Sequence, residues 1–133
     1  MDVLSFSTIA GNIKNEINRK CGLNLSQIRI LLYFDQNNNT ALKMGDLADN
    51  LKISLSTLSR QLQQKKTVSF ITVKRSEKDS SKIVLLNETG LQKIIQLKQV
   101  LNEIEESLLQ GLSKQEVATF NRIFSELLQR SEK

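Results

Sequence analysis

The chain has 133 residues, of which 39% are hydrophobic and 25% are charged, and its formal net charge is +5. This length fits one globular domain with a single core and leaves little room for a disordered tail. The chain contains no histidine and one cysteine. The commonest general base and the commonest metal ligands are therefore missing, and no internal disulfide can form. We expect neither an enzyme nor a metal site, and we expect no cofactor.

The sequence also bears on the compartment. It has no basic leader followed by an apolar run, and no apolar stretch of about 18 residues that would span a membrane. One cysteine in the whole chain fits a reducing environment. We therefore expect a cytoplasmic protein without membrane association.

The positive charge is concentrated in the middle of the chain. Nine basic and four acidic residues lie between Thr40 and Leu86, and the two flanking segments are neutral in sum. A concentration of this kind predicts a surface that binds a polyanion.

Two helices are predicted in the first third of the chain. Residues 3–20 form the first, whose apolar residues recur every four positions: Ile9, Ile13 and Ile17. Gly22 would end this helix. Asn24 and Gln27 have the spacing of a capping box, so a second helix begins there and continues to about residue 36. The DQNNNT run that follows predicts a turn.

The period of the pattern changes in the middle of the chain. Residues 43–51 predict a short helix, and Ser54 is a suitable N-cap for the next helix, which covers residues 54–66. The apolar stripe of that helix would consist of Leu55, Leu58 and Leu62. Residues 68–75 and 82–86 are rich in β-branched side chains, so they predict a β-hairpin around a charged loop.

Two further helices complete the chain. Asn87 would cap a long helix over residues 88–110, whose apolar seam is typical of helices that pack lengthwise. Ser113 and Glu116 would form a second capping box before the last helix. That helix carries Val117, Phe120, Phe124 and Leu127 on one face. We predict a mainly α fold with a small β-hairpin.

The helix over residues 54–66 has a polar face opposite its leucines. Arg can form two hydrogen bonds to guanine, Gln can do the same with adenine, and Ser or Thr can reach bases or phosphate without bulk. We therefore predict that this face enters the major groove of double-stranded DNA, with Lys65 and Lys66 near phosphates. The predicted contacts are Ser54, Ser56, Thr57, Arg60, Gln61 and Gln64. The alternative, for this stretch alone, is an ordinary solvated helix face.

The order of the elements is more informative than any one of them. Two helices, a turn, a polar-faced helix and a basic hairpin describe a winged helix-turn-helix. In such a fold the hairpin, called the wing, contacts a phosphate backbone or the minor groove. The predicted wing contacts are Lys74, Arg75, Lys78 and Lys82. The alternative is that these residues are edge-strand charges that discourage aggregation.

The chain resembles the MarR family of bacterial transcriptional regulators over nearly its whole length. The matching segments, in order, are GLNLSQIRIL (22–31), DLADNLKIS (46–54), STLSRQLQQKK (56–66), VKRSEKD (73–79) and LNETG (86–90). The resemblance implies one domain, residues 1–133, with a DNA-binding lobe at 24–86 and dimerisation helices at 1–21 and 87–133. It implies a homodimeric repressor that binds an inverted-repeat operator.

The resemblance also implies which surfaces meet in the homodimer, in agreement with the apolar faces of the terminal helices. The expected interface residues are Ile9, Ile13, Ile17, Leu101, Ile104, Leu108, Phe120, Phe124 and Leu127. The alternative is that these faces pack within one chain.

The wing departs from the family pattern of Asp, one spacer residue and Arg, in which the Asp braces the loop and the Arg reaches the minor groove. Asp79 matches the brace, but Ser80 and Ser81 follow it, so the role of the Arg would pass to Lys78 or Lys82. Members of the family also carry a glycine after the recognition helix. This chain has Thr67 there, which disfavours a left-handed conformation.

Regulation by a small molecule is a further implication, because many relatives bind an effector and others sense oxidants through a cysteine. The effector of this chain has no predicted identity. Cys21 is the candidate redox sensor, since the cations Arg19 and Lys20 beside it favour a reactive thiolate. A buried or incidental cysteine is the alternative. If Cys21 is a sensor, peroxide should weaken DNA binding in the parent but not in Cys21→Ser.

One alternative function belongs to another class. A winged domain can serve as a protein-interaction module that binds a partner regulator and has weak or no specific affinity for DNA. The two functions differ in their response to salt. A protein that binds DNA releases counterions from the phosphates, and the free energy gained by that release falls as the salt concentration rises, so DNA affinity falls steeply. A protein-interaction module without DNA would not show this dependence.

Overall fold

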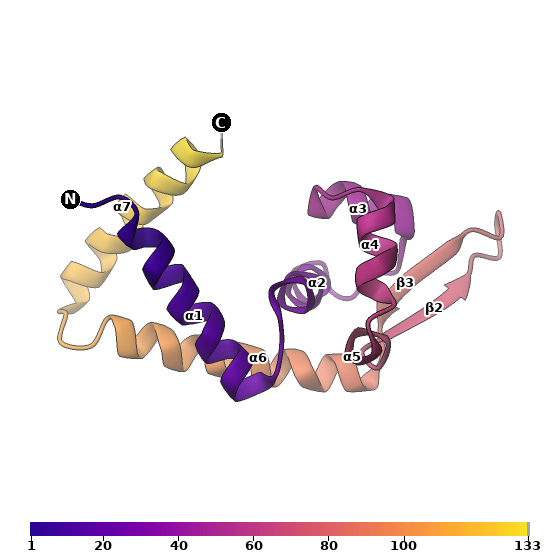
Figure 1. Ribbon diagram of the computed structural model, residues 1–133, viewed down its shortest axis with the longest axis horizontal. Helices are drawn as coiled ribbons and strands as arrows, with labels where there is room; N and C mark the ends of the chain where they lie inside the picture. The colour runs from indigo at the N-terminus through magenta and orange to yellow at the C-terminus, as the bar shows by residue number, and fades with distance from the viewer. Residues whose placement is uncertain (133) are drawn as a thin grey trace. The chain divides into compact units, whose positions relative to one another are not determined.

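The computed structural model describes residues 1–132 and divides into two compact units. Unit 1 spans Met1–Leu101 and unit 2 begins at Asn102, within helix α6. The elements in chain order (Figure 1) are α1 (Ser5–Cys21), α2 (Leu25–Gln36), β1 (Leu42–Lys43), α3 (Met44–Leu51), α4 (Leu55–Leu62), α5 (Lys65–Val68), β2 (Ile71–Arg75), β3 (Lys82–Leu86), α6 (Glu88–Leu108) and α7 (Lys114–Ser131). The predicted mainly α fold with a small hairpin is confirmed.

The core of unit 1 lies where α2, α3, α4 and β3 meet. Helix α2 contacts α3 and β3, and α3 contacts α4. The side chains that are completely inaccessible to solvent are Leu23, Phe34, Leu47, Leu58, Val84 and Leu97. Removing such apolar side chains from water is the main stabilising contribution to a fold of this size. In Figure 1 the β2–β3 hairpin extends outward from this core, with its loop at the far end.

The predicted helix caps are confirmed. Gly22 follows α1 in the left-handed region with φ of 69°, as a C-terminal glycine does. The capping boxes at Asn24 and Ser113 are both formed, with reciprocal hydrogen bonds to Gln27 and Glu116. Asn87 caps α6, because its side-chain oxygen accepts from the backbone N–H of Gly90 at 2.9 Å.

The sheet has one strand more than the predicted hairpin. Its order is β1-β3-β2, and all neighbours are antiparallel. Strand β1 consists of Leu42 and Lys43 alone, which pair with Val84 and Ile83 of β3. Two residues are too few to produce an alternating pattern, so the sequence carried no signal for β1.

Part of the first predicted strand is wrong. Residues 68–75 were expected to be extended, but β2 begins at Ile71 and Val68 ends the short helix α5. The backbone N–H of Val68 donates to the Gln64 carbonyl, and that of Phe70 donates to the Thr67 carbonyl. These turns place Phe70 in the core at 5% exposure. Burial of the aromatic ring therefore overrides the β propensity of the segment.

The helix predicted over residues 54–66 is shorter than expected. Helix α4 ends at Leu62, and a turn separates it from α5. Within the predicted apolar stripe, Leu58 and Leu62 are buried, whereas Leu55 is 53% exposed. Leu55 lies in the first turn of α4, and the buried residues of the helix, Leu58 and Leu62, lie one and two turns further along.

Within residues 1–132, no helix combines the length and the hydropathy that crossing a bilayer requires.

Candidate nucleic-acid interface

The N-terminus of α4 is held by Ser54. Its hydroxyl oxygen accepts from the Thr57 backbone N–H at 3.1 Å and donates to the Thr57 hydroxyl at 2.8 Å. The Ser56 hydroxyl lies 3.1 Å away. Ser54 is thus engaged in capping its own helix, which fixes where α4 begins. Ser56 is exposed beside it.

Arg60 is the one cation on α4, and it projects into solvent. Its guanidinium contacts the Thr57 hydroxyl at 3.5 Å, one turn earlier in the helix. Among the residues that the structure describes, no carboxylate forms an ion pair with Arg60. An exposed guanidinium without an acidic partner keeps most of its N–H donors available for a ligand.

The two predicted glutamine contacts lie in different places. Gln61 is half-buried and lines a hollow with Leu25 and Arg29 of α2 and with Ile53, which follows α3. Gln64 is not on α4 but at the junction with α5, where its side-chain oxygen accepts from Asn24 Nδ2 at 3.2 Å. The sequence pattern placed Gln64 on the same helix as Gln61 because the predicted helix continued past Leu62, where α4 ends.

Lys65 and Lys66 differ although both are exposed. The Lys66 ammonium donates at 2.6 Å to the carbonyl of Gly22, the residue directly after α1. Lys65 has no such contact among the described residues. The predicted contact with phosphates is therefore easier for Lys65, whose ammonium is not held by a backbone carbonyl of residues 1–132, than for Lys66.

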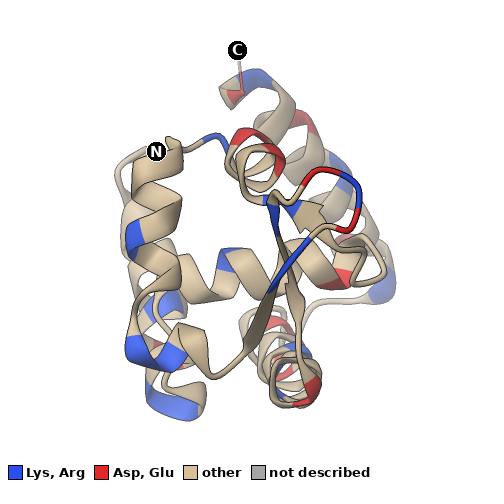
Figure 2. Ribbon diagram, turned by 90° about the vertical axis from the view of Figure 1, so that its right-hand side faces the viewer, with Lys and Arg blue, Asp and Glu red and all other residues tan. Residues whose placement is uncertain are grey.

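The hairpin carries its positive charge on both strands (Figure 2). Arg75 and Lys82 are direct partners in the β2–β3 register. The Arg75 guanidinium donates to the Ser80 carbonyl at 3.0 Å within the wing. In residues 1–132, none of the four predicted wing cations forms an ion pair: Lys74, Arg75, Lys78 and Lys82.

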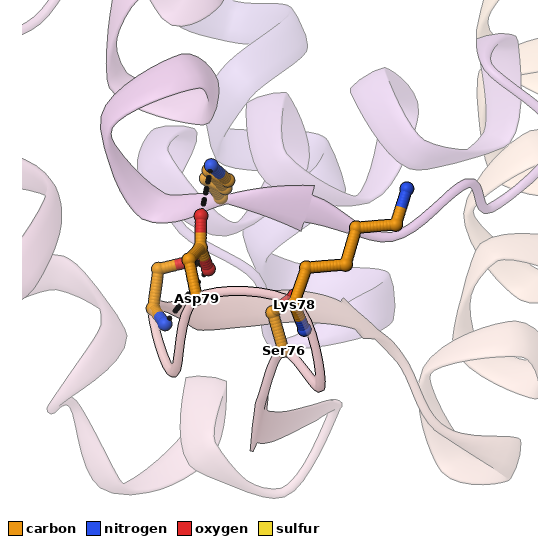
Figure 3. A network of polar contacts seen from close by, with 5 residues as sticks. Ser76, Lys78 and Asp79 are labelled. Atoms are coloured by element: carbon orange, nitrogen blue, oxygen red, sulfur yellow. Dashed lines mark hydrogen bonds and ion pairs between the residues drawn. The ribbon is translucent and has the colours of Figure 1, made fainter.

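Asp79 ties the wing loop to Lys43 of strand β1, directly before helix α3 (Figure 3). One carboxylate oxygen accepts from the Lys43 ammonium at 2.6 Å, and the other accepts from the Ser81 hydroxyl at 2.6 Å and its backbone N–H at 3.1 Å. Its hydrogen bond with Lys43, helped by those from Ser81, lowers the pKa of Asp79. The same hydrogen bond raises the pKa of Lys43. Because its pKa lies below the ordinary value of a carboxyl group, Asp79 is ionised at neutral pH and can accept from the Lys43 ammonium.

Lys43 is the participant that the sequence pattern missed. It precedes Asp79 by 36 residues, and it belongs to the two-residue strand that had no periodic signal. The sequence pattern placed Lys43 as the first residue of the helix predicted over residues 43–51, and the only cue to its role was its positive charge in a basic segment.

The predicted dimer residues of unit 1 differ in exposure along α1. Ile9 is 47% exposed, Ile13 is half-buried, and Ile17 is 4% exposed. Ile17 therefore contributes to the core of its own unit, and Ile9 is left with an apolar face toward solvent. Leu101 at the end of unit 1 is half-buried.

Unit 2 leaves most of its apolar surface uncovered. Helix α7 has no buried residue. The Phe120 and Phe124 rings stack with centroids 5.8 Å apart, yet they are 46% and 42% exposed, and Leu127 is 39% exposed. On α6, Leu108 is 56% exposed and Ile104 is half-buried. Such a face is unusual for a helix surrounded by water alone.

Cys21 is the last residue of α1 and is 5% exposed. Burial limits the access of dissolved oxidants to its sulfur. The described chain also contains no group of three or more Cys, Asp and Glu side chains that would hold a metal ion.

The fold, in contrast to the sequence, has clear relatives. No protein-family profile and no curated protein sequence matches the chain. YusO from Bacillus subtilis is 18% identical with a TM-score of 0.76, and the match covers 93% of this chain and 86% of YusO. MepR from S. aureus, solved as a DNA complex, is 21% identical with a TM-score of 0.71 and coverages of 98% and 96%.

A third relative is a mutant of MarR from E. coli, solved in complex with operator DNA. It is 16% identical with a TM-score of 0.72, and the match covers 96% of this chain and 99% of that one. Identities this low establish similarity of fold only. The chain has the fold of MarR, the winged helix-turn-helix that its sequence predicts.

Proposed function

We propose that the chain is a sequence-specific DNA-binding transcription regulator of the MarR family. The observation that carries the proposal is a set of cations without acidic partners on two neighbouring elements of unit 1, Arg60 on α4 and four basic residues on the hairpin. Arg75 and Lys82 even oppose one another across the strands, an arrangement that a bound polyanion would stabilise. The complex of a MarR mutant with operator DNA and the MepR–DNA complex support the same use of this fold.

In this proposal α4 is the recognition helix and the hairpin is the wing. Ser56, Thr57, Arg60 and Gln61 contact bases or phosphates in the major groove, with Ser54 fixing the start of the helix. Lys74, Arg75, Lys78 and Lys82 contact the phosphate backbone or the minor groove. Gln64 contributes through its hydrogen bond with Asn24 rather than through DNA.

The proposal includes a homodimer. The uncovered apolar residues of α1, α6 and α7 would be buried against a second copy, since an exposed face of this kind marks an interaction surface. A two-fold symmetric dimer with one recognition helix in each copy would select an inverted repeat. Binding over a promoter would make the protein a repressor.

Selection of duplexes from a random DNA pool, at near-physiological salt and with the purified protein, tests the proposal. Enrichment of an inverted repeat is the expected result, and its half-site spacing reports the separation of the two α4 helices. Retention of all sequences with a steep salt dependence would reduce the function to non-specific binding. No retention at any salt would favour a protein-interaction module instead.

Light scattering tests the homodimer separately. The parent should have the mass of two chains, and Phe124→Glu, which places a charge on the uncovered face of α7, should have the mass of one. A parent that is monomeric at all concentrations would contradict this part of the proposal.

A further inference from the structure

Lys43 and Asp79 add a side-chain contact between strand β1 and the tip of the wing, beyond the backbone pairing of β1 with β3. Lys43 is the residue before α3 and is paired with Ile83 in the β1–β3 ladder. Asp79 is in the loop between β2 and β3. Their side chains are 2.6 Å apart and about half exposed, at 51% and 45%. The contact therefore ties the wing loop to the helix that precedes α4.

The loop is closed around this contact by its own hydrogen bonds. The Ser76 N–H donates to the Ser81 carbonyl at 2.7 Å, and the Ser80 N–H donates to the Ser76 carbonyl at 3.0 Å. Ser80 has a positive φ of 62°, a conformation that costs a non-glycine residue free energy and persists only where the surroundings hold it. The second oxygen of the Asp79 carboxylate, bound to Ser81, supplies such a restraint.

Lys78 is the cation that this arrangement presents. It precedes Asp79 directly, its backbone N–H donates to the Ser76 hydroxyl at 3.3 Å, and its side chain extends away from Asp79 in Figure 3. Glu77 and Asp79 flank it in sequence. With Asp79 occupied by Lys43, the ammonium of Lys78 is not drawn back to its neighbour.

We propose that Lys43 is a positioning residue for DNA binding: by holding Asp79 against the start of α3, it fixes the wing loop so that Lys78 reaches the DNA backbone. This inference rests on the proposed function. An exposed ion pair contributes little to global stability. Its effect is to reduce the conformational freedom that the loop would lose on binding.

Asp79→Asn distinguishes a positioning role of Lys43 from a purely electrostatic effect of Asp79, because the two predict opposite changes in DNA affinity. An acidic residue near DNA repels phosphates, so its neutralisation alone would tighten binding. If Lys43 positions the loop through Asp79, the same substitution releases the loop and weakens binding by about 2- to 5-fold.

The experiment measures the dissociation constant and its salt dependence for the full chain on the duplex enriched by the selection. The variants are Asp79→Asn, Lys43→Met, their combination and Lys43→Arg, each alone and with Lys78→Ala. Nitrogen-15 relaxation of residues 76–81 in the protein without DNA gives a readout that does not depend on binding.

Four results are expected. Asp79→Asn and Lys43→Met each weaken binding, and their combination is no worse than either one, because both break one contact. Lys43→Arg retains the parent affinity. With Lys78→Ala present, the other substitutions change the dissociation constant by less than about twofold, because the contact acts through Lys78. Order parameters of the loop fall in both single variants.

Other results overturn the inference. Tighter binding by Asp79→Asn, or an unchanged loop order parameter in Lys43→Met, would show that the contact positions nothing. If Lys43→Met weakens binding equally with and without Asp79→Asn, Lys43 contacts DNA itself. If the parent binds no duplex, the proposed function fails, and relaxation alone decides whether Lys43 restrains the loop.

Discussion

Arg75 and Lys82 face each other across the antiparallel β2–β3 pair, with no carboxylate in an ion pair with either one within residues 1–132. Like charges at directly opposed positions destabilise a sheet. The two cations therefore repel each other within the hairpin, and replacing either one would relieve this repulsion. Such a substitution should raise the stability of the protein and weaken its binding to DNA.

Lys82→Glu should show these opposite responses. Converting the repulsive pair to an attractive one should raise the free energy of unfolding by about 0.2–1 kcal/mol. The same change should weaken DNA binding and flatten its salt dependence, because a phosphate contact is replaced by a repulsive charge. Chemical denaturation and binding titrations at several salt concentrations measure the two effects.

Lys82→Gln is the matched control, and it should fall between the parent and Lys82→Glu in both measurements. A glutamate variant that is less stable than the glutamine variant would show that Arg75 and Lys82 do not interact across the register. Equal DNA affinity in all three proteins would remove Lys82 from the wing contacts.

Arg60→Ala should lose about 1–3 kcal/mol of DNA-binding free energy and relax the base preference at one position of the site. The physical reason is that the guanidinium projects from α4 with only a 3.5 Å contact to Thr57. Repeating the duplex selection with the variant measures the preference. A uniform loss across all sequences would instead identify Arg60 as a phosphate contact.

The features that the sequence predicted are local, and those it missed join distant segments. Both capping boxes are correct because each depends on two residues three positions apart, as with Asn24 and Gln27. The contact of Lys43 with Asp79 spans 36 residues and that of Gln64 with Asn24 spans 40. No periodicity encodes such pairs, since they depend on how the elements pack.

Lys65→Gln and Lys66→Gln should separate two adjacent cations. Replacing Lys65 should reduce the log-log salt slope by about 0.9, as loss of one phosphate contact does. Replacing Lys66 should leave the slope almost unchanged, because its ammonium is hydrogen-bonded to the Gly22 carbonyl. It should lower thermal stability slightly instead. If Lys66→Gln reduced the salt slope and Lys65→Gln did not, Lys66 would have to leave the Gly22 carbonyl when DNA binds.

Gly90→Ala should destabilise the protein by about 1–3 kcal/mol. A Cβ at position 90 would overlap the Phe70 carbonyl oxygen, which also accepts from the Asn87 N–H at 2.9 Å. The start of α6 therefore approaches the base of the hairpin more closely than a side chain allows. Thermal unfolding measures the loss.

Gly45→Ala provides the control for Gly90→Ala, since a Cβ there would meet no atom within 4 Å. Alanine favours a helix over glycine, so this variant should be stabilised by about 0.5–1 kcal/mol. If both variants lost stability equally, the contact between Gly90 and Phe70 would not be the cause.

Gln27 and Thr67 form a buried polar pair that links α2 to α5. Gln27 Nε2 donates to the Thr67 hydroxyl at 3.3 Å, and the two residues are 4% and 1% exposed. Gln27 also accepts from the Asn24 N–H through its other amide atom. Thr67 lies in helix α5 with an ordinary negative φ, so the glycine that the family pattern suggested for this position is not required for the backbone.

Thr67→Val should destabilise the protein by about 1–3 kcal/mol, because it keeps the shape of the side chain but leaves the buried Gln27 amide without its acceptor. Thr67→Ser retains the hydroxyl and loses one methyl group, so its loss reports packing alone. Denaturant unfolding compares the two variants. If Thr67→Val loses more stability than Thr67→Ser, the hydrogen bond to Gln27 stabilises the protein. If Thr67→Ser loses more, Thr67 contributes through packing alone.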